Sequence, residues 1–268
     1  ASKIQRTYDS SNNLIEEIID PDGAAITTSY TYLNGNLERT DFPDGSFETI
    51  TYTANNLPEL TTRSSGLFSK NEYDANDRIT KIIESFNKST FTTNENEHKV
   101  TTYDYTPEYT GDDGSVEADS PRAVTVSLLG NPVSKTYYGY LPNEEHTIYG
   151  ATPTSAITDT NNLISSTFTN AEGEVEKTIE PDGTGSIIPY ETVGDTTTTT
   201  TESGVFNAGL TAIVQGTETV DIVTNDLEVS SHTFDIDSGL LLNSRVITER
   251  DSADREKRVD YHDGTYEM

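Results

Sequence analysis

The sequence predicts an all-β fold of tandem antiparallel β-hairpins, with a repeating unit of about 22 residues. First, an aromatic residue recurs at intervals of 22, 22 and 21 residues, and a glycine stands seven residues before each recurrence. Second, each copy carries two turn signals, one rich in asparagine and one containing that glycine. Third, no window shows the apolar period of a helix. A fixed period of about 20 to 50 residues is typical of repeat architectures.

The second copy, from Tyr30 to Tyr52, predicts how each unit folds. Its Asn34-Gly35 pair suits the positive φ values of a two-residue hairpin turn. At the other turn, Pro43 presets φ for the second position and Gly45 takes the left-handed position. Two turns per copy leave strands of roughly 6 to 9 residues, which is an ordinary strand length.

The other copies keep parts of the same pattern. The first opens at Tyr8, the third lacks the Pro-Asp-Gly sequence, and a later copy begins at Phe168. A last partial copy of the pattern lies at 260–267. The residues predicted to define the structural repeat are Tyr8, Pro21, Gly23, Tyr30, Pro43, Gly45, Tyr52, Gly66, Tyr73, Phe168, Pro181, Gly183 and Tyr190.

A single hairpin cannot bury its apolar face, so successive copies are expected to pack side by side and share a core. In a common register, the tyrosine of one copy lies beside that of the next, and such cross-strand pairs contribute about 0.2–1 kcal/mol each. We therefore interpret the tyrosines first as core residues. The alternative is a platform on which sugars stack.

The pattern of Tyr-Asp, a polar turn, an aliphatic residue, Asp-Pro-Asp-Gly and a return to Tyr resembles the YD repeat. That repeat occurs in Rhs proteins, teneurins and insecticidal toxin complexes. The match covers residues 1 to about 86 and reappears from Phe168 to Tyr190. The resemblance implies hairpins wound into a spiral or shell-like sheet, often a hollow shell around a toxin or other C-terminal polypeptide.

Three regions are predicted along the chain. Residues 1–103 hold YD-type repeats, 104–167 form a β-rich insert or divergent repeats, and 168–268 hold further divergent repeats cut short at the C-terminus. Tyr103 is the expected closing aromatic of the fourth unit. The threonine run 196–201 is expected to be a strand because threonine is β-branched.

The amino-acid composition and net charge limit the classes of molecule that the chain can bind. The formal charge of −29 disfavours nucleic acid and anionic membrane surfaces. No apolar run is long enough to insert into a membrane, no signal peptide opens the chain, and both ends look cut. We expect a segment of a longer protein that is secreted, extracellular or at the cell surface.

No residue is assigned a catalytic, cofactor-binding or metal-binding role. The four histidines lack zinc-ligand spacing, and His262 takes the place that Pro43 holds in another turn. Asp237-Ser238-Gly239 resembles an aspartic protease motif but is expected to be a turn. Acidic side chains that would suit calcium, and that we expect to be solvated instead, are Asp112, Asp113, Glu117, Asp119, Asp235 and Asp237.

The leading interpretation is a non-enzymatic scaffold or encapsulating shell segment of a large bacterial Rhs/YD-repeat protein. Its partners would be neighbouring repeats or an enclosed C-terminal polypeptide. A glycan- or protein-binding adhesion module is one alternative, favoured if Tyr137, Tyr138, Tyr140 and Tyr149 are exposed. A self-assembling extracellular filament, joined through open sheet edges, is another. A polysaccharide-acting enzyme is the last, and it requires a His and a Tyr within hydrogen-bond reach in one groove.

Overall fold

The computed structural model describes residues 3–86, 92, 94–156 and 159–268. Within them the protein is almost entirely β-structure, with 22 strands and a short 3-10 helix, η1 (Glu95–Glu97). The strand pairs are antiparallel, and most join strands that are consecutive in sequence. The predicted all-β class of tandem antiparallel hairpins is therefore confirmed. No helix in these residues has the length and apolar character needed to cross a membrane.

The chain forms two compact units. Unit 1 comprises Ala1–Thr106 and Ala118–Thr136, and unit 2 comprises Pro107–Glu117 and Tyr137–Met268. In the sequence, the segment from Pro107 to Glu117 lies between the two parts of unit 1, but it packs with unit 2. Strand β11 (Asn131–Leu141) belongs to unit 1 up to Thr136 and to unit 2 from Tyr137 onward.

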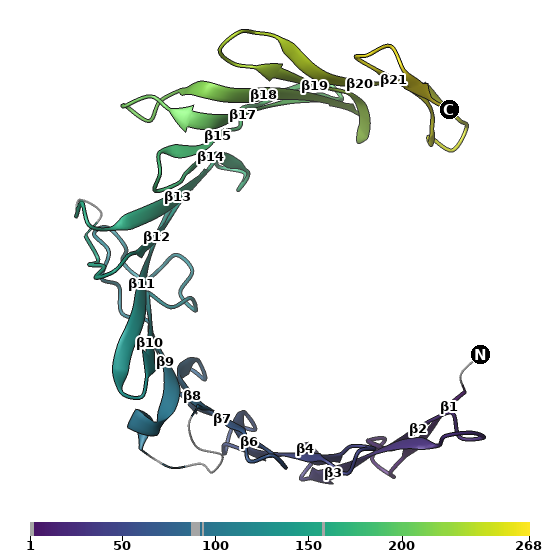
Figure 1. Cartoon of the computed structure of the whole chain (residues 1–268), viewed down its shortest axis with the longest axis vertical. Coiled ribbons are helices and arrows are strands. Elements are labelled where there is room, and N and C mark those ends of the chain that lie inside the picture. The colour runs from purple at the N-terminus through teal and green to yellow at the C-terminus, as the bar shows by residue number, and fades with distance from the viewer. Residues whose placement is uncertain (1–2, 87–91, 93, 157–158) are drawn as a thin grey trace. The chain divides into compact units, whose positions relative to one another are not determined.

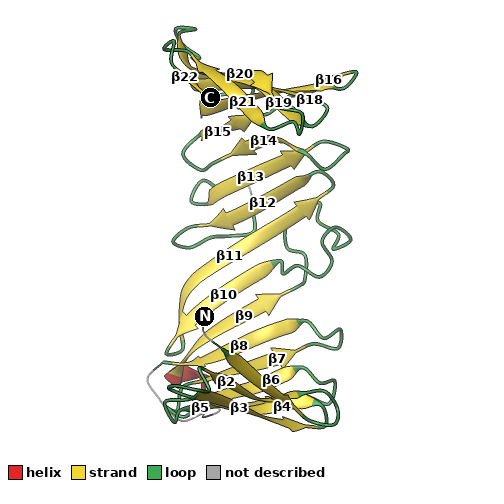
Figure 2. Ribbon diagram, turned by 90° about the vertical axis from the view of Figure 1, so that its right-hand side faces the viewer, coloured by secondary structure: helices red, strands yellow, loops and turns green. Residues whose placement is uncertain are grey.

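Unit 1 is a meander in which each strand from β1 to β9 pairs with the next, and β9 pairs with β10 (Figures 1 and 2). Alternate turns of a meander lie on opposite edges of the sheet, so one kind of turn gathers at each edge. Its strands are β1 (Ile4–Tyr8), β2 (Leu14–Ile19), β3 (Ile26–Leu33), β4 (Asn36–Asp41), β5 (Phe47–Tyr52), β6 (Pro58–Arg63), β7 (Phe68–Tyr73), β8 (Ile79–Ser85), β9 (His98–Asp104) and β10 (Ala123–Leu128).

Unit 2 is a second meander with one irregularity, because β15 and β16 both pair with β17. The threonine run 196–201 lies within β17, which confirms the strand expected there. Besides the end of β11, its strands are β12 (Glu144–Tyr149), β13 (Leu163–Thr169), β14 (Val175–Ile179), β15 (Thr184–Ile187), β16 (Tyr190–Val193), β17 (Thr196–Phe206), β18 (Ile213–Thr224), β19 (Leu227–Asp235), β20 (Leu241–Arg250), β21 (Glu256–Tyr261) and β22 (Tyr266–Glu267).

Two strands of the region 104–167 each pair with a strand that extends beyond its bounds, and β11 pairs with β12 within it. β10 pairs with β9, and β12 pairs with β13, whose last residue is Thr169. These strands therefore continue the meanders on either side of them.

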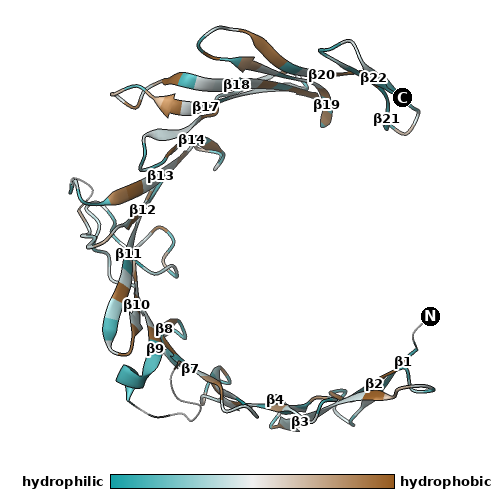
Figure 3. Ribbon diagram, viewed as in Figure 1, coloured by the Kyte–Doolittle hydropathy of each residue, from teal (hydrophilic) through white to brown (hydrophobic). Residues whose placement is uncertain are grey.

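Little of the protein is fully buried. The accessible surface is 16032 Å², against about 11500 Å² for a compact monomer of this mass. Hydrophobic stretches alternate with polar ones along the strands (Figure 3). The buried hydrophobic residues are Phe68, Ile83, Val100 and Ala123 in unit 1, and Tyr137, Ile148, Phe206, Ile213 and Val259 in unit 2. Among the residues that the structure describes, only Phe68, Ile83 and Val100 form a buried cluster, beside the partly buried Leu60.

Candidate functional site

A recurrent β-bulge marks the repeat in unit 1. Four hairpins carry a register shift directly before the last tyrosine of their first strand, and the extra residue of each bulge lies opposite it in the second strand. The extra residues are Ile15, Glu38, Glu59 and Thr80. The tyrosines at this position are Tyr8, Tyr32, Tyr52 and Tyr73. Tyr32 therefore occupies the position that the sequence pattern gave to Tyr30, which lies in β3 opposite Thr40.

At two of these four positions the tyrosine hydroxyl reaches across to the strand before it. Tyr52 Oη donates to the carbonyl of Leu37 at 2.7 Å, and Tyr73 Oη donates to that of Pro58 at 2.8 Å. Both carbonyls lie just beyond the end of the backbone ladder that joins the two strands. The tyrosine thus supplies a hydrogen bond where backbone pairing stops. We call this interaction the tyrosine latch.

The latch recurs beyond the regular copies. Tyr190 Oη donates to the carbonyl of Val175 at 3.1 Å, with the same separation of 15 residues as in the two latches above. Tyr105 Oη donates to the carbonyl of Ile79 at 2.8 Å. The closing aromatic of the fourth unit is accordingly Tyr105 rather than Tyr103, which pairs with Val124 inside the sheet. A longer connection between β8 and β9 hides this equivalence in the sequence.

Removing one latch should cost little but measurable stability. We expect Tyr52→Phe to lower the free energy of unfolding by about 0.5–1.5 kcal/mol, because it removes one hydrogen bond and keeps the ring. Urea unfolding followed by circular dichroism measures this. Tyr30→Phe is the matched control, since the structure shows no hydrogen bond from the Tyr30 hydroxyl to any described residue. Equal losses in the two variants would contradict a special role for the bulge tyrosine.

The residue after the tyrosine caps the turn that follows. Asp74 Oδ1 accepts the backbone N–H groups of Asn76 and Arg78 at 2.8 and 3.0 Å, and Oδ2 accepts Arg78 Nε at 2.9 Å. Asp77 takes the left-handed conformation, with φ 62°. The same two backbone bonds to a side-chain oxygen recur at Asp9, Thr53, Asn170 and Asp251. The Tyr-Asp pair thus joins a latch to a turn cap.

The glycine-containing turns form the opposite edge. Asp44 Oδ1 accepts Ser46 N and Oγ at 2.9 and 2.6 Å, and Gly45 has φ 81°, as predicted from the sequence. Gly66 and Gly183 also take the left-handed conformation. Gly23 does not, and Asp20 takes a φ of 55° there instead. A Cβ on Gly23 would lie 2.2 Å from Asp20 Oδ2, so a larger residue there would displace the Asp20 side chain from its bond with the Ala24 N–H.

The comparisons with known proteins bear on this geometry. No protein-family model matches the chain, and no curated protein matches it. A crystal structure of TcdB2-TccC3-Cdc42 does, with a TM-score of 0.51 and 12% sequence identity over 97% of this chain. The chain has the YD-repeat fold. It spans 14% of the length of that protein.

Two further structures match with TM-scores of 0.49 and 13% identity. They are TcdB2-TccC3 without its hypervariable C-terminal region and the Photorhabdus luminescens Tc holotoxin pore. Each match covers 97% of this chain and 14% of the chain in the solved structure.

Several turn carboxylates have pKa values below their ordinary range. Hydrogen bonds from the backbone N–H and the guanidinium of Arg78 lower the pKa of Asp74. The side chain and backbone N–H of Ser46 lower the pKa of Asp44. The pKa values of Asp9, Asp182, Asp251 and Asp263 are lowered by equivalent bonds.

Acid should therefore weaken the turns. A carboxylate with a depressed folded-state pKa contributes stability that is fully present above its unfolded pKa, about 3.9, and is lost as pH falls through the folded value. We expect the thermal midpoint to drop between about pH 5 and about pH 2. The double variant Asp44→Asn/Asp74→Asn keeps an acceptor oxygen at each turn and does not titrate there, so its drop should be smaller. An identical drop in parent and variant would contradict the assignment.

The two turn interpretations of candidate catalytic residues are confirmed. His262 is the second residue of the turn Tyr261–Thr265, as Pro43 is in Phe42–Ser46. In the Asp237-Ser238-Gly239 stretch, Ser238 donates both N–H and Oγ–H to Asp235 Oδ1, and Gly239 has φ 65°.

The most buried polar group of unit 2 surrounds His146. Its Nδ1 lies 2.8 Å from Ser166 Oγ, and its Nε2 lies 2.6 Å from Glu144 Oε1. Tyr109 stacks on the imidazole with ring centroids 5.0 Å apart. Tyr109 also covers Gly139, where a Cβ would lie 2.5 Å from its Cγ. This Tyr–His pair is stacked rather than hydrogen-bonded, and it fastens the segment 107–117 to the sheet.

The adhesion interpretation required the four tyrosines outside the repeat to be exposed, and none of them is fully exposed. Tyr137 is buried, and Tyr138, Tyr140 and Tyr149 are half-buried. Tyr138 and Tyr140 stack with centroids 6.4 Å apart.

The acidic loops serve as turn elements. Asp112 accepts the backbone N–H groups of Gly114 and Tyr140 at 2.8 and 3.2 Å. Among the residues that the structure describes, no three His, Asp or Glu side chains are grouped to hold a metal ion.

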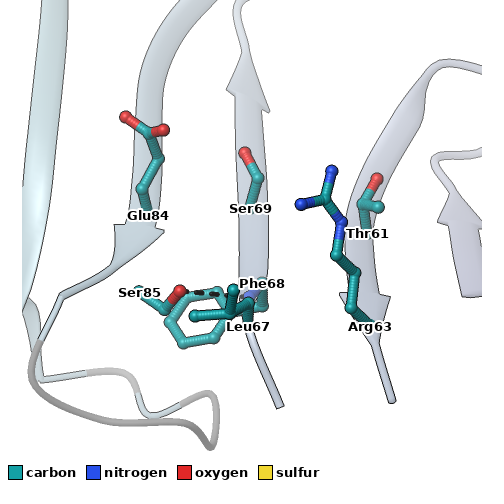
Figure 4. A pocket seen from close by; sticks show the side chains of 7 residues that line it. All are labelled: Thr61, Arg63, Leu67, Phe68, Ser69, Glu84 and Ser85. Carbon is teal, nitrogen blue, oxygen red and sulfur yellow. Dashed lines mark hydrogen bonds between the residues drawn. The ribbon is translucent and has the colours of Figure 1, made fainter. Parts of the chain in front are cut away.

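Pockets open between successive turns at both edges of unit 1. The one in Figure 4 has a volume of about 260 Å³ and lies on the glycine-turn edge. Phe68 and Leu67 lie at one end beside Ser85, whose Oγ accepts the Phe68 N–H at 3.2 Å. Arg63 and Glu84 stand on either side of Ser69 (Figure 4).

Proposed function

We propose that this chain is a structural repeat segment of a large bacterial Rhs/YD-repeat protein, serving as scaffold or as part of an encapsulating shell. The observation that carries the proposal is the recurrence of the latch in successive hairpins of unit 1 and again at Tyr190 in unit 2, together with the turn cap in both units. Such a device gives each hairpin the same geometry, which a wall built from repeats requires.

The large accessible surface supports the same function. A sheet with so few fully buried side chains leaves both faces available to other parts of a larger assembly. Its partners would be neighbouring repeats of the parent protein or a polypeptide enclosed by it. The setting that we propose for such a segment is secreted or at the cell surface. The acidic charge of −29 suits a soluble outer surface.

The first experiment is the size and shape of the purified chain in solution, by small-angle scattering with electron microscopy. A wall segment should be monomeric, with a radius of gyration above the roughly 18 Å expected for a compact domain of this length. A compact particle near that value would count against the proposal.

The same electron micrographs also test a second function, which is self-assembly into a filament. In the described residues β1 pairs on one side only, with β2, and its Ile4 and Tyr8 are about half exposed. An open strand of this kind can template pairing with another chain. Regular filaments would identify the protein as a self-assembling filament subunit and replace the wall function.

A further inference from the structure

Strand β16 departs from the regular pairing of unit 2. The preceding strand, β15, pairs with β14 on one side and with β17 on the other. β16 continues along the same side of β17, beside residues 196–199, and pairs with no other strand in the described part of the chain. The side of β16 that faces away from β17 is therefore an open sheet edge.

The open edge begins where the tyrosine latch of unit 2 ends the ladder. Tyr190, the first residue of β16, donates its hydroxyl to the carbonyl of Val175, the first residue of β14. In unit 1 a turn follows the latch tyrosine directly, but here the chain runs on as a strand to Val193. β16 thus projects beyond the start of β14 (Figure 2). All four of its residues are exposed, and Val193 is 70% exposed.

The backbone of β16 presents unpaired groups on this open side. The Thr200 N–H donates to the carbonyl of Pro189 at 3.2 Å. Because bonded and non-bonded pairs alternate in an antiparallel ladder, the backbone groups of Glu191 point toward β17. Those of Tyr190 and Thr192 point the other way, and no described residue bonds to them. An exposed row of N–H and C=O groups can accept one more strand.

The charges around the edge favour a cationic strand. Residues 178–244, which contain β15 to β19, hold eleven Asp and Glu residues and no Lys or Arg. Glu191 stands on β16 itself, and Asp195 and Asp226 line a pocket of about 300 Å³ that Thr192 also lines. Among the described residues, these three carboxylates make no hydrogen bond or ion pair. A basic side chain beside the edge would therefore meet uncompensated negative charge.

A second copy of the chain is a poor occupant of the same edge. The open groups of Tyr190 and Thr192 flank Glu191, so a two-fold antiparallel pairing of β16 with itself sets Glu191 opposite its own copy. Like charges directly opposite each other destabilise a sheet. The net charge of −29 on each copy adds repulsion. A strand with a lysine or arginine at that position replaces the repulsion with attraction.

We propose that the open edge of β16 binds an extended basic peptide by strand addition. The peptide backbone bonds the N–H and C=O groups of Tyr190 and Thr192, and a basic side chain lies opposite Glu191. The apolar stem of such a side chain also covers Val193 on the same face. This docking edge goes beyond the scaffold function and does not depend on it, because β16 is open whether or not the chain forms part of a wall.

Fluorescence polarisation with the whole chain tests the edge. The probe is a fluorescein-labelled decapeptide of alternating lysine and valine. Its controls are the glutamate–valine decapeptide and the lysine–valine decapeptide with an N-methyl group on every residue. We expect the probe to bind at least about tenfold more tightly than either control, because one has the wrong charge and the other has no backbone N–H to donate. Equal binding of the probe and its N-methylated form would overturn strand addition.

A proline on the edge strand tests the location. Thr192→Pro removes an N–H that points away from β17, and proline is tolerated at such edge positions. We expect it to weaken probe binding at least about tenfold, with an unchanged far-ultraviolet circular dichroism spectrum. The matched control is Ile4→Pro on β1, whose N–H also points away from its partner strand because Asp20 N–H donates to the carbonyl of Lys3. The control should bind as the parent does, and equal affinities of the two variants would overturn the proposal.

A charge reversal tests the chemistry of the partner. Glu191→Lys should weaken binding of the lysine–valine probe at least about tenfold. Glu145→Lys makes the same change in net charge at an exposed position of β12 and should bind nearly as the parent does. No binding of the probe up to about 1 mM would overturn the proposal. A dimer of the free chain in sedimentation that Thr192→Pro abolishes would also overturn it, because a second copy would then occupy the edge.

Discussion

Replacing Gly204 with valine is expected to destabilise unit 2 by about 3–5 kcal/mol, among the largest losses a single substitution causes. Gly204 lies inside β17 with φ 153°, a conformation that side chains other than glycine rarely adopt. A Cβ built there would stand 2.0 Å from the carbonyl oxygen of Gln215 on β18. Valine therefore adds backbone strain to a collision with the neighbouring strand.

The effect should spread because Gly204 belongs to a row of glycines. Gly185 on β15 and Gly216 on β18 are its register partners on either side. Their φ values are 158° and 153°, and a Cβ on either would lie about 2 Å from a backbone carbonyl oxygen. Glycines inside strands permit sharp bends and close backbone approach. A side chain at any of these positions would collide with the backbone of a neighbouring strand, which is β14 for Gly185, β18 for Gly204 and β17 for Gly216.

Hydrogen exchange followed by mass spectrometry localises the damage. In Gly204→Val the backbone amides of β15, β17 and β18 should exchange faster than in the parent. The urea concentration at which these three strands unfold should also be lower. Thr201→Val is the control on the same strand, because it keeps a β-branched side chain of similar size and should change stability by less than about 1 kcal/mol. Unaltered exchange in the glycine variant would refute the argument.

This glycine row illustrates what the sequence could not provide. A glycine inside an apparent strand signals a bulge or close approach, so each of the three positions could have been noticed. Their alignment depends on strand pairing between residues 185, 204 and 216, which no local pattern specifies. The turn chemistry was predictable by contrast, because Pro43, Asp44 and Gly45 act within five residues of one another.

The displaced tyrosine has a related cause. The connection from β2 to β3 contains six residues, 20–25, whereas the connection from β4 to β5 contains five, 42–46. The Asn34-Gly35 turn, which follows Tyr30, is shorter than its counterparts. The spacings from Tyr8 to Tyr32 and from Tyr32 to Tyr52 are therefore 24 and 20 residues, which average 22, so Tyr30 fits the period in the sequence. The bulge, which assigns the position to Tyr32, becomes visible only in the register.

The edge of unit 1 that carries the Asn turns was predictable only in part. The Asn-rich turns and the tyrosines were evident in the sequence, and sugar stacking was an alternative use of the tyrosines. The adhesion surface was predicted on the tyrosines of β11 and β12, which are half-buried or buried. The bulge residues Glu38 and Glu59 carried no signal, since charged residues on a strand are ordinary. Their equivalence depends on the latch geometry.

Replacing Phe68 with alanine is expected to destabilise unit 1 by about 3–5 kcal/mol. The Phe68 side chain is 5% exposed and packs with Ile83 and Val100 in the one buried hydrophobic cluster found among the described residues. Its ring also meets the buried His98 edge-on, with centroids 4.9 Å apart. Because the sheet buries so few side chains, one aromatic carries a large share of the stability of its unit.

Urea unfolding of Phe68→Ala should show a lower midpoint, with faster hydrogen exchange in β7, β8 and β9 than in the parent. Leu67→Ala is the matched control, because the adjacent Leu67 is 48% exposed and its truncation should cost less than about 1 kcal/mol. If both variants unfold at the same urea concentration, the cluster does not hold unit 1 together. The hydrogen bonds of the latches and turn caps would then have to supply most of its stability, and the loss in Tyr52→Phe should exceed the value expected for a single bond.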